Sequence, residues 1–331
     1  MPSSSNLRMR VLAVLLGACA AWTWPFDAMS QGSFPDKPIR LIVPQAPGAA
    51  TDLLARSVAA EIEVFLNQKI IVENKPGAGF TIGLDIVAKA APDGYTLGMG
   101  PVGALAISPN MVAKMPYDVL RDFQPIAQLT RGHLLLAVSP KSNIRSVQEL
   151  IAEAKKNPGK LTNASSANGS PGHVGGELFK VMTGTRIVHV PYRGGPAAMN
   201  DLIAGHVQLM FESLNSIAPH AHTGAVRGLA VSGARRSPMF KDLPTIAEAG
   251  VPGYDAPTWS GIVGPAKMPR AVVMRLNEAI NKALTSPAFI DRFGKIGDEP
   301  AGGLPEEFGE TIRVELAKWA DVIKRSGAKL E

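Results

Sequence analysis

The sequence predicts an α/β fold with two similar lobes, each built on a mostly parallel sheet flanked by helices. Runs of β-branched residues alternate with helix-length amphipathic segments, the pattern of parallel strands joined by crossover helices. The order of strand, small-residue loop, helix, strand, glycine loop, helix and strand then occurs twice, once in each half of the chain. This repetition predicts two lobes of the same construction.

The first half is expected to begin with a strand over residues 39–43, which Pro44 ends. A helix is expected over 51–66, because apolar residues recur there at helical spacing and Thr51 or Asp52 can cap its first turn. The other expected elements are a strand over 69–73, a helix over 81–90 and a strand over 95–99.

The second half repeats this order and adds two crossings. Its expected elements are a strand over 161–166, a helix from about 172 to 181, a strand over 187–191, a helix over 197–204 and a strand over 207–211. Strands over 134–138 and 258–263 are expected to carry the chain between the lobes, and helices over about 270–285 and 305–326 to pack on the first lobe. The expected division is therefore residues 34–131 with about 258–331 as the first lobe and residues 132–257 as the second.

The N-terminus reads as an export signal over residues 1–30. Arg8 and Arg10 precede an apolar run over 11–21 that is too short to span a bilayer. Cleavage before Gln31 is expected, because small residues stand at the two positions that a signal peptidase reads. A lipobox-like segment ending at Cys19 leaves lipid anchoring open as the alternative.

Composition excludes several classes of function. The net charge of +6 arises from scattered residues with no long basic run, so no nucleic-acid partner is expected. Cys19 is the only cysteine and lies in the export signal, which excludes a disulfide framework and a thiol nucleophile from the folded part.

Loops rich in small residues follow the predicted strands. In open α/β sheets the ligand crevice lies at the carboxyl ends of the strands, where free amides at helix N-termini can hold an anion. Each loop alone is ordinary turn chemistry, but similar loops in both lobes favour a binding site. The loops are residues 44–51, 76–81, 165–170 and 192–195.

Several segments together resemble the tripartite tricarboxylate transporter receptors, also called Bug-type solute-binding proteins. The resemblance runs from about Phe34 to the C-terminus, and the segments that carry it are Phe34-Pro35-Asp36-Lys37-Pro38, Asn74-Lys75-Pro76-Gly77-Ala78-Gly79, Ser165-Ser166 with Gly169-Ser170 and His173, His189-Val190-Pro191-Tyr192-Arg193-Gly194, Glu248-Ala249-Gly250 and Trp259-Ser260-Gly261.

The resemblance implies a type II periplasmic binding protein fold with a ligand cleft between two lobes. It also implies a monomeric, periplasmic receptor without cofactor, which binds a small carboxylate through amides, hydroxyls and waters and delivers it to membrane transporter subunits. The ligand contacts expected from the matching loops and their surroundings are Gln45, Gly48, Ala49, Ala50, Thr51, Asp52, Gly79, Phe80, Thr81, Val102, Ser165, Ser166, Ser170, His173, Tyr192, Gly194, Gly195 and Glu212.

The chain departs from the family pattern at several of these positions. Gln45 stands where the family usually has Phe, Phe80 where glycine is common, and Val102 where hydroxyl residues are usual. If Phe80 and Val102 face the cleft, they favour a more apolar or aromatic acid than the usual dicarboxylates.

Other chemistries are weaker interpretations. A secreted hydrolase using Ser170 and His173 is the runner-up, and a ligand sensor for a signalling partner is a third class. The glycines after residue 76 miss the dinucleotide spacing by one residue, and the pair His220 and His222 reads as an exposed turn and not a metal site. Glu212, at a strand end, can either accept a ligand amino or hydroxyl group or cap a helix.

Overall fold

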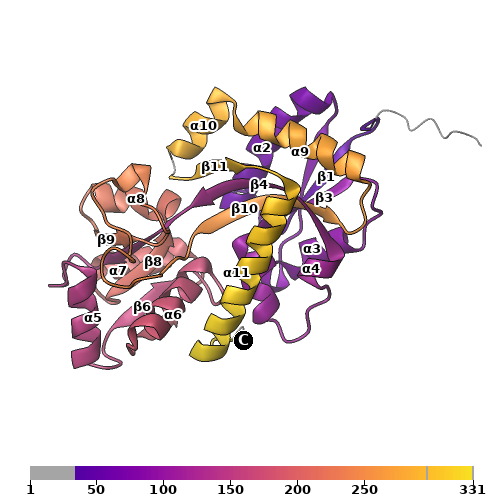
Figure 1. The fold of residues 1–331 in the computed structure, drawn as a ribbon. Coiled ribbons are helices and arrows are strands. Elements are labelled where there is room, and N and C mark those ends of the chain that lie inside the picture. The colour runs from indigo at the N-terminus through magenta and orange to yellow at the C-terminus, as the bar shows by residue number, and fades with distance from the viewer. Residues whose placement is uncertain (1–33, 296, 330–331) are drawn as a thin grey trace, which may run out of the picture. The chain divides into compact units, whose positions relative to one another are not determined.

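The computed structural model describes residues 34–295 and 297–329. The predicted signal peptide, its cleavage site and Cys19 lie outside the described residues. Residues from Lys37 onward form one unit that contains two β-sheets (Figure 1). In the described part of the chain, no helix combines the length and the apolar composition needed to cross a bilayer.

The first sheet has the strand order β11-β4-β10-β3-β1-β2. Strand β1 pairs in parallel with β2 and β3, whereas β10 runs antiparallel to β3 and β4, and β11 antiparallel to β4. Its strands are β1 (Ile39–Val43), β2 (Ile70–Asn74), β3 (Thr96–Pro101), β4 (Phe123–Gly132), β10 (Thr258–Pro265) and β11 (Glu299–Gly302).

The second sheet has the order β7-β6-β8-β5-β9. Strand β6 pairs in parallel with β7 and β8, and β5 runs antiparallel to β8 and β9. Its strands are β5 (Leu134–Val138), β6 (Thr162–Ser165), β7 (Val188–Pro191), β8 (Leu209–Ser213) and β9 (Arg227–Val231).

Helices flank both sheets. Those that accompany the first sheet are α2 (Ala50–Leu66), α3 (Thr81–Ala88), α4 (Val119–Asp122), α9 (Arg270–Leu284), α10 (Pro287–Gly294) and α11 (Pro305–Ser326). Those that accompany the second are α5 (Val147–Lys156), α6 (Pro171–Thr183), α7 (Gly195–Ala204) and α8 (Leu214–His222). Short turns of other helix types lie at Ala78–Phe80, Gly103–Ile107, Ser108–Asn110 and Pro238–Phe240.

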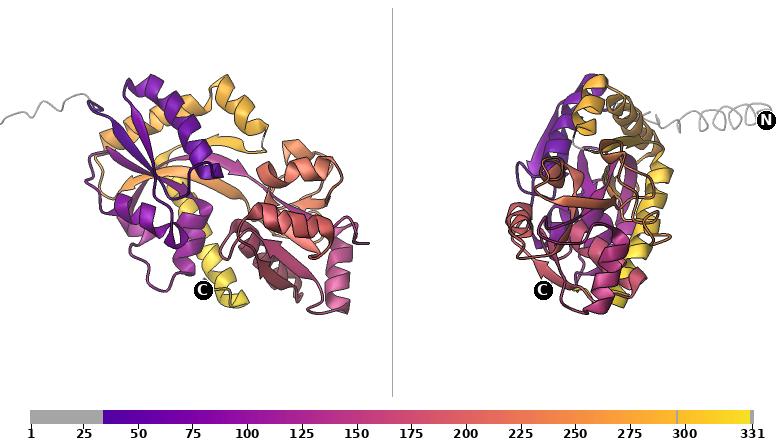
Figure 2. Two further views of the ribbon diagram at one scale, coloured as in Figure 1. Left: turned by 180° about the vertical axis from the view of Figure 1, so that it is seen from behind. Right: turned by 90° about the vertical axis from the view of Figure 1, so that its left-hand side faces the viewer.

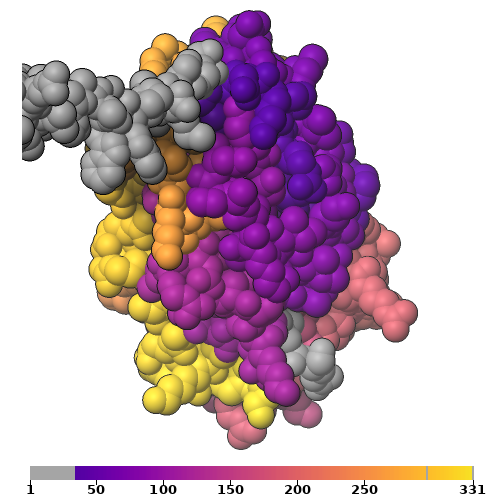
Figure 3. Space-filling model, turned by 90° about the vertical axis from the view of Figure 1, so that its right-hand side faces the viewer, coloured from indigo at the N-terminus to yellow at the C-terminus, as the bar shows by residue number. Residues whose placement is uncertain are grey.

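Three segments connect the sheets. His133 alone separates β4 from β5, and the chain returns to the first sheet in β10. The third connection is α11, which packs against both β4 and α6 and is seen running from one sheet toward the other in Figure 2. Figure 3 shows α11, in yellow, along one side of the face that the N-terminal part of the unit forms in indigo and purple.

The buried core continues across these connections. One cluster of buried apolar residues includes Leu105 beside the first sheet, Phe211 on the second and Trp319 on α11. The ring of Trp259 meets that of Phe308 edge-on at a centroid distance of 5.8 Å, which ties β10 to α11. Burial of these rings adds to the stabilisation that the largely aliphatic core provides.

Every strand and helix expected from the sequence is present, and the α/β fold class is confirmed. Both sheets are mixed and not mostly parallel, because the crossing strands β4, β5 and β10 enter them antiparallel. His220 and His222 were expected in an exposed turn, but both lie in the last turn of helix α8; His222 is exposed as expected, and its ring stacks on that of Phe240 with centroids 4.6 Å apart. The helix continues through Pro219 because its other face buries Leu214 and Ile217.

Candidate functional site

Helices α2, α6, α7 and α8 all begin at one cavity of about 840 Å³, whose lining comes from both sheets. The first amides of a helix have no partner within the helix and carry the positive end of its dipole. A cavity at which several helices begin is therefore suited to an anionic group.

Segments of the first sheet and its helices form one side of the cavity. The residues they contribute are Gln45, Gly48–Thr51, Leu53, Leu54, Phe80, Pro101–Gly103, Thr130, Thr258–Ser260, Phe293 and Asp298. The second sheet and its helices contribute Ser166, Pro171, Gly172, Gly194–Pro196, Glu212, Ser213, Asn215 and Ser216.

The loop before α2 is held by its own side chains. The Thr51 amide donates to Gln45 Oε1 at 3.2 Å, so Gln45, and neither Thr51 nor Asp52, caps the first turn. Asp52 is 2% exposed and accepts from the Gly48 amide at 2.8 Å, from Arg56 and from Asn74. Burial opposes its charge, but these donors together lower the pKa of Asp52. Asp52 therefore stabilises the loop and lies outside the cavity lining.

The loop before α3 places an aromatic wall beside the cavity. Phe80 adopts a left-handed conformation with φ of 76°, which is unusual for a residue with a side chain. Its ring packs over Gly103, where an added Cβ would lie 3.0 Å from Phe80 Cε2. Thr81 donates its hydroxyl to the Ala78 carbonyl at 2.8 Å, and neither Thr81 nor Gly79 lines the cavity.

Two stacked histidines support the loop after β6. Ser165 donates its hydroxyl to the Ala167 carbonyl at 3.0 Å, so it accepts from His189 Nε2 at 2.7 Å. The His189 ring stacks on that of His173 with centroids 3.8 Å apart. Burial, with His173 adding to it, lowers the pKa of His189 to about 4. His189 is therefore neutral near pH 7.

Ser170 and His173 do not form a nucleophile and base. Ser170 Oγ accepts from the His173 amide at 3.3 Å and caps α6. His173 Nδ1 accepts from the Gly169 amide at 3.0 Å, while its Nε2 lies 3.6 Å from Glu177. Both side chains hold the loop behind Ser166, which does line the cavity.

The loop before α7 contributes glycine backbone. Gly194 and Gly195 line the cavity, whereas Tyr192 donates its hydroxyl to Asp201 at 2.6 Å and does not line it. Burial, together with Asp201, raises the pKa of Tyr192 to about 12. Arg193 is exposed and also lies outside the lining.

Glu212 and Asp298 are the acidic residues of the lining, and among the described residues no Lys, Arg or His accompanies them there. Glu212 Oε1 accepts from the Ser213 amide at 2.9 Å. Burial raises the pKa of Glu212, and burial also raises the pKa of Asp298 to about 6. Both carboxyls face the cavity without a basic neighbour in the described ion pairs.

The structure thus brings together many of the residues expected at the site. Those that line the cavity are Gln45, Gly48, Ala49, Ala50, Thr51, Phe80, Val102, Ser166, Gly194, Gly195 and Glu212. Those that lie behind it are Asp52, Gly79, Thr81, Ser165, Ser170, His173 and Tyr192.

Sequence reasoning missed lining residues on the crossing strands and on the C-terminal segment, namely Thr130, Thr258, Ser260, Phe293 and Asp298, and polar residues at the start of α8, namely Asn215 and Ser216. Its position in the expected crossing strand over 258–263 could have indicated Thr258, whereas Thr130 lies in β4, which was not expected as a strand. No local signal marks Asp298.

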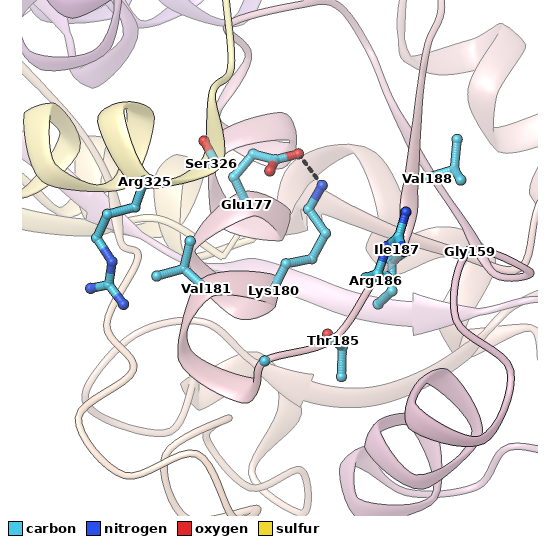
Figure 4. A pocket seen from close by; sticks show the side chains of 11 residues that line it. Gly159, Glu177, Lys180, Val181, Thr185, Arg186, Ile187, Val188, Arg325 and Ser326 are labelled. Carbon is cyan, nitrogen blue, oxygen red and sulfur yellow. Dashed lines mark ion pairs between the residues drawn. The ribbon is translucent and has the colours of Figure 1, made fainter.

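A second hollow of about 510 Å³ lies on the second-sheet side between α6, the segment leading into β7 and the end of α11 (Figure 4). Its lining includes Lys180, Arg186 and Arg325, and the dashed line in Figure 4 joins Lys180 Nζ to Glu177 Oε1 at 2.6 Å. This hollow lies along the later turns of α6 and not at a helix N-terminus. Its positive charge therefore comes from side chains and not from backbone amides. Nowhere in residues 34–295 or 297–329 do three or more His, Cys, Asp or Glu side chains gather as a metal site would require.

The family comparison places most of the chain in one family model. Residues 54–328 match the model described as tripartite tricarboxylate transporter family receptor. A protein from Pseudomonas sp. strain P51, described as UPF0065 protein in the tcbD-tcbE intergenic region, is 36% identical over 324 residues, which are 97% of this chain and 96% of that protein. Protein BugT of Bordetella pertussis is 35% identical over 326 residues, 98% of this chain and 100% of BugT.

Solved structures show the same fold. Rpa4515 of R. palustris with adipate superposes with a TM-score of 0.78 at 37% identity, covering 90% of this chain and 100% of that one. MatC of Rhodopseudomonas palustris with bound malate gives a TM-score of 0.76 at 29% identity, covering 88% of this chain and 100% of that one.

Proposed function

The chain belongs to the tripartite tricarboxylate transporter receptor family, and from this premise we propose that it binds a small carboxylate in the cavity lined by both sheets. As a member of this family it is a solute receptor and not an enzyme. Its relatives Rpa4515 and MatC are described with adipate and malate, which supports a carboxylate as the ligand here.

The observation that carries this proposal is the convergence of helix N-termini on the cavity. Backbone amides at the starts of α2, α6 and α7 are available from Ala50, Gly172 and Gly195. In the loop before α2, the amides of Gly48, Ala49 and Thr51 already donate to acceptors of that loop and helix. Such amides hold a carboxylate without a buried cationic side chain. The glycines let the ligand approach the backbone closely.

We propose that binding closes two lobes over the ligand. The first lobe is residues 34–131 with about 258–331, and the second is residues 132–257. The strand pair β4–β5, joined at His133, supports a hinge at this boundary, because one residue separates the two sheets there. A ligand that touches both lobes shifts the population toward the closed form, whose surface a transporter can recognise.

The ligand's remaining part is expected to be more apolar than a short dicarboxylate. Phe80, Val102 and Leu54 line the cavity, and burying an apolar carbon chain or ring against them is favourable. This supports a longer-chain or aromatic acid.

We place the receptor in the periplasm, as a monomer that delivers its ligand to the membrane subunits of such a transporter. Relatives are described as a periplasmic transporter and a periplasmic binding protein, which supports this location. Cleavage before Gln31 and lipid anchoring at Cys19 remain the two alternative N-terminal processing routes.

The test is a thermal-shift and calorimetric screen of residues 31–331 against mono-, di- and aromatic carboxylates. A ligand that binds only the folded state raises the apparent melting temperature. Gly195→Leu should abolish the shift, because its side chain would enter the cavity, where a Cβ alone lies 3.6 Å from Glu212 Oε2.

Ala197→Leu is the matched control, since Ala197 is exposed on the same helix and outside the lining. Equal binding by both variants would refute the site, and no shift with any acid would refute carboxylate binding.

A further inference from the structure

The cavity carries acidic side chains and no basic one in its described lining. A receptor that held a second carboxylate of its ligand by charge would be expected to place Lys or Arg there. The lining has Glu212 and Asp298 instead, and neither carboxyl forms an ion pair with a Lys, Arg or His of residues 34–295 or 297–329. The negative charge of these two side chains would repel a ligand with two carboxylates.

Glu212 is aimed into the cavity from the second sheet. It ends the buried part of β8, where Phe211 is fully buried, and its Oε2 would lie 3.6 Å from a Cβ on Gly195. Among the described residues, only Oε1 takes part in a hydrogen bond, which it accepts from the Ser213 amide. Oε2 is therefore free to accept a hydrogen bond from a ligand.

Asp298 faces the cavity from the segment that enters β11 of the first sheet. It lies against Gly132, where an added Cβ would collide with Asp298 Oδ1 and lie 2.8 Å from Thr258 Oγ1. The side chain of Asp298 makes no hydrogen bond or ion pair with the residues that the structure describes. The absence of a side chain at Gly132 leaves room for the carboxyl beside the crossing strand.

We propose that the ligand carries a protonated amine as well as its carboxylate, and that Glu212 and Asp298 bind this cation. The proposal rests on the proposed function, because the helix N-termini are taken to hold the ligand's carboxylate. One acidic group comes from each sheet, so a cation between them also draws the two lobes together.

The negative charges of Glu212 and Asp298 attract an ammonium group and repel a second carboxylate. Charge-assisted hydrogen bonds to an ammonium group satisfy two half-buried carboxyls that have no counter-ion among the described residues. A second carboxylate on the ligand would be repelled by the same two groups, which sets specificity against diacids. Hydroxyls of Ser216 and Thr258 in the lining can accept the remaining ammonium hydrogens.

The experiment compares matched ligands by calorimetry on residues 31–331. 5-Aminopentanoate is paired with adipate, and aspartate with malate, so that each pair differs by an ammonium group in place of a carboxylate or a hydroxyl. The amine is expected to bind roughly 10-fold or more tightly than its partner in at least one pair, the size of one charge-assisted hydrogen bond. Tighter binding of adipate and of malate than of their amino partners would overturn the proposal.

Two variants locate the effect. Glu212→Gln and Asp298→Asn should each weaken the amino ligand by about 10- to 100-fold while leaving or improving the affinity for its partner. Glu299→Gln is the matched control, because it removes the same charge beside Asp298 but lies outside the cavity lining. Unchanged amine affinity in both cavity variants would refute the assignment.

The outcomes separate this inference from the proposed function. If a variant does not fold, the ligand pairs in the unmodified chain decide. Binding of acids without preference for the amine overturns only the cation site, whereas no binding of any acid overturns the carboxylate receptor as well.

Discussion

Asp298→Asn should change how the stability of the ligand-free protein depends on pH. Burial raises the pKa of Asp298 from 3.8 to about 6 in the folded state. A carboxyl whose pKa is raised by folding contributes stability below its unfolded pKa and loses that contribution as pH rises through the folded pKa. The unmodified protein should therefore lose stability from this group between about pH 4 and pH 6.

The magnitude follows from the difference between the two pKa values. From 3.8 to about 6 is roughly two pKa units, or about 3 kcal/mol at pH 8. Part of the carboxyl faces the open cavity, where solvent screens the charge, so about 1–2 kcal/mol is expected. Asparagine keeps the shape and cannot ionise, which removes this contribution.

The assay is urea unfolding of both proteins at intervals from pH 4 to pH 8. The difference between the two free energies of unfolding isolates Asp298, because His133 and other titrating groups are common to both. The variant should gain on the unmodified protein by about 1–2 kcal/mol across this window. A difference that is constant with pH would show that Asp298 ionises as freely in the folded protein as in the unfolded chain, and would refute the reasoning.

Three further predictions concern the loops. Folding lowers the pKa of His189 to about 4, so the unmodified protein should lose stability as pH falls from 6.5 to about 4, and His189→Asn should reduce that loss. Urea unfolding at a series of acidic pH values measures this, and the two free energies of unfolding should differ by up to about 3 kcal/mol at the acid end. Gln45→Ala removes the acceptor of the Thr51 amide, which should lower the free energy of unfolding in urea by about 1 kcal/mol. The freed amide should tighten carboxylate binding a few-fold. Loss of stability without tighter binding would show that the ligand does not use this amide. Thr51→Val should weaken ligand binding by roughly 10-fold in calorimetry with little change in melting temperature, because it removes a hydroxyl from the lining and keeps the side chain's shape; unchanged affinity would remove Thr51 from the contacts.

Local signals in the sequence predicted most of the frame. The strands over 39–43 and 134–138 and the helix over 305–326 coincide with β1, β5 and α11, because apolar periodicity and bounding Pro or Gly residues mark them directly. The antiparallel entry of β10 was not predictable in this way, since its pairing with β3 joins residues about 160 positions apart.

At the candidate site, the sequence likewise predicted the loops that take part but not the directions of their side chains. Loops that follow parallel strands must meet at one edge, so Gly48, Ser166 and Gly195 could be expected at a common cavity. Side-chain direction within those loops was not predictable: Asp52 turns back to the Gly48 amide, and Tyr192 turns to Asp201. These local hydrogen bonds satisfy the polar groups that the sequence alone would assign to a ligand.

The role of Glu212 shows why the tertiary structure is needed to infer the ligand. Its place at a strand end predicted that it faces the crevice, but an acidic residue there fits a cation only if no lysine or arginine of the chain neutralises it. Arg193, the nearest candidate in the sequence motifs, is exposed and outside the lining, while Asp298 arrives from a segment near the other end of the chain. The backbone loops therefore specify that an acid is bound, and the side chains brought together by folding specify what else that acid must carry.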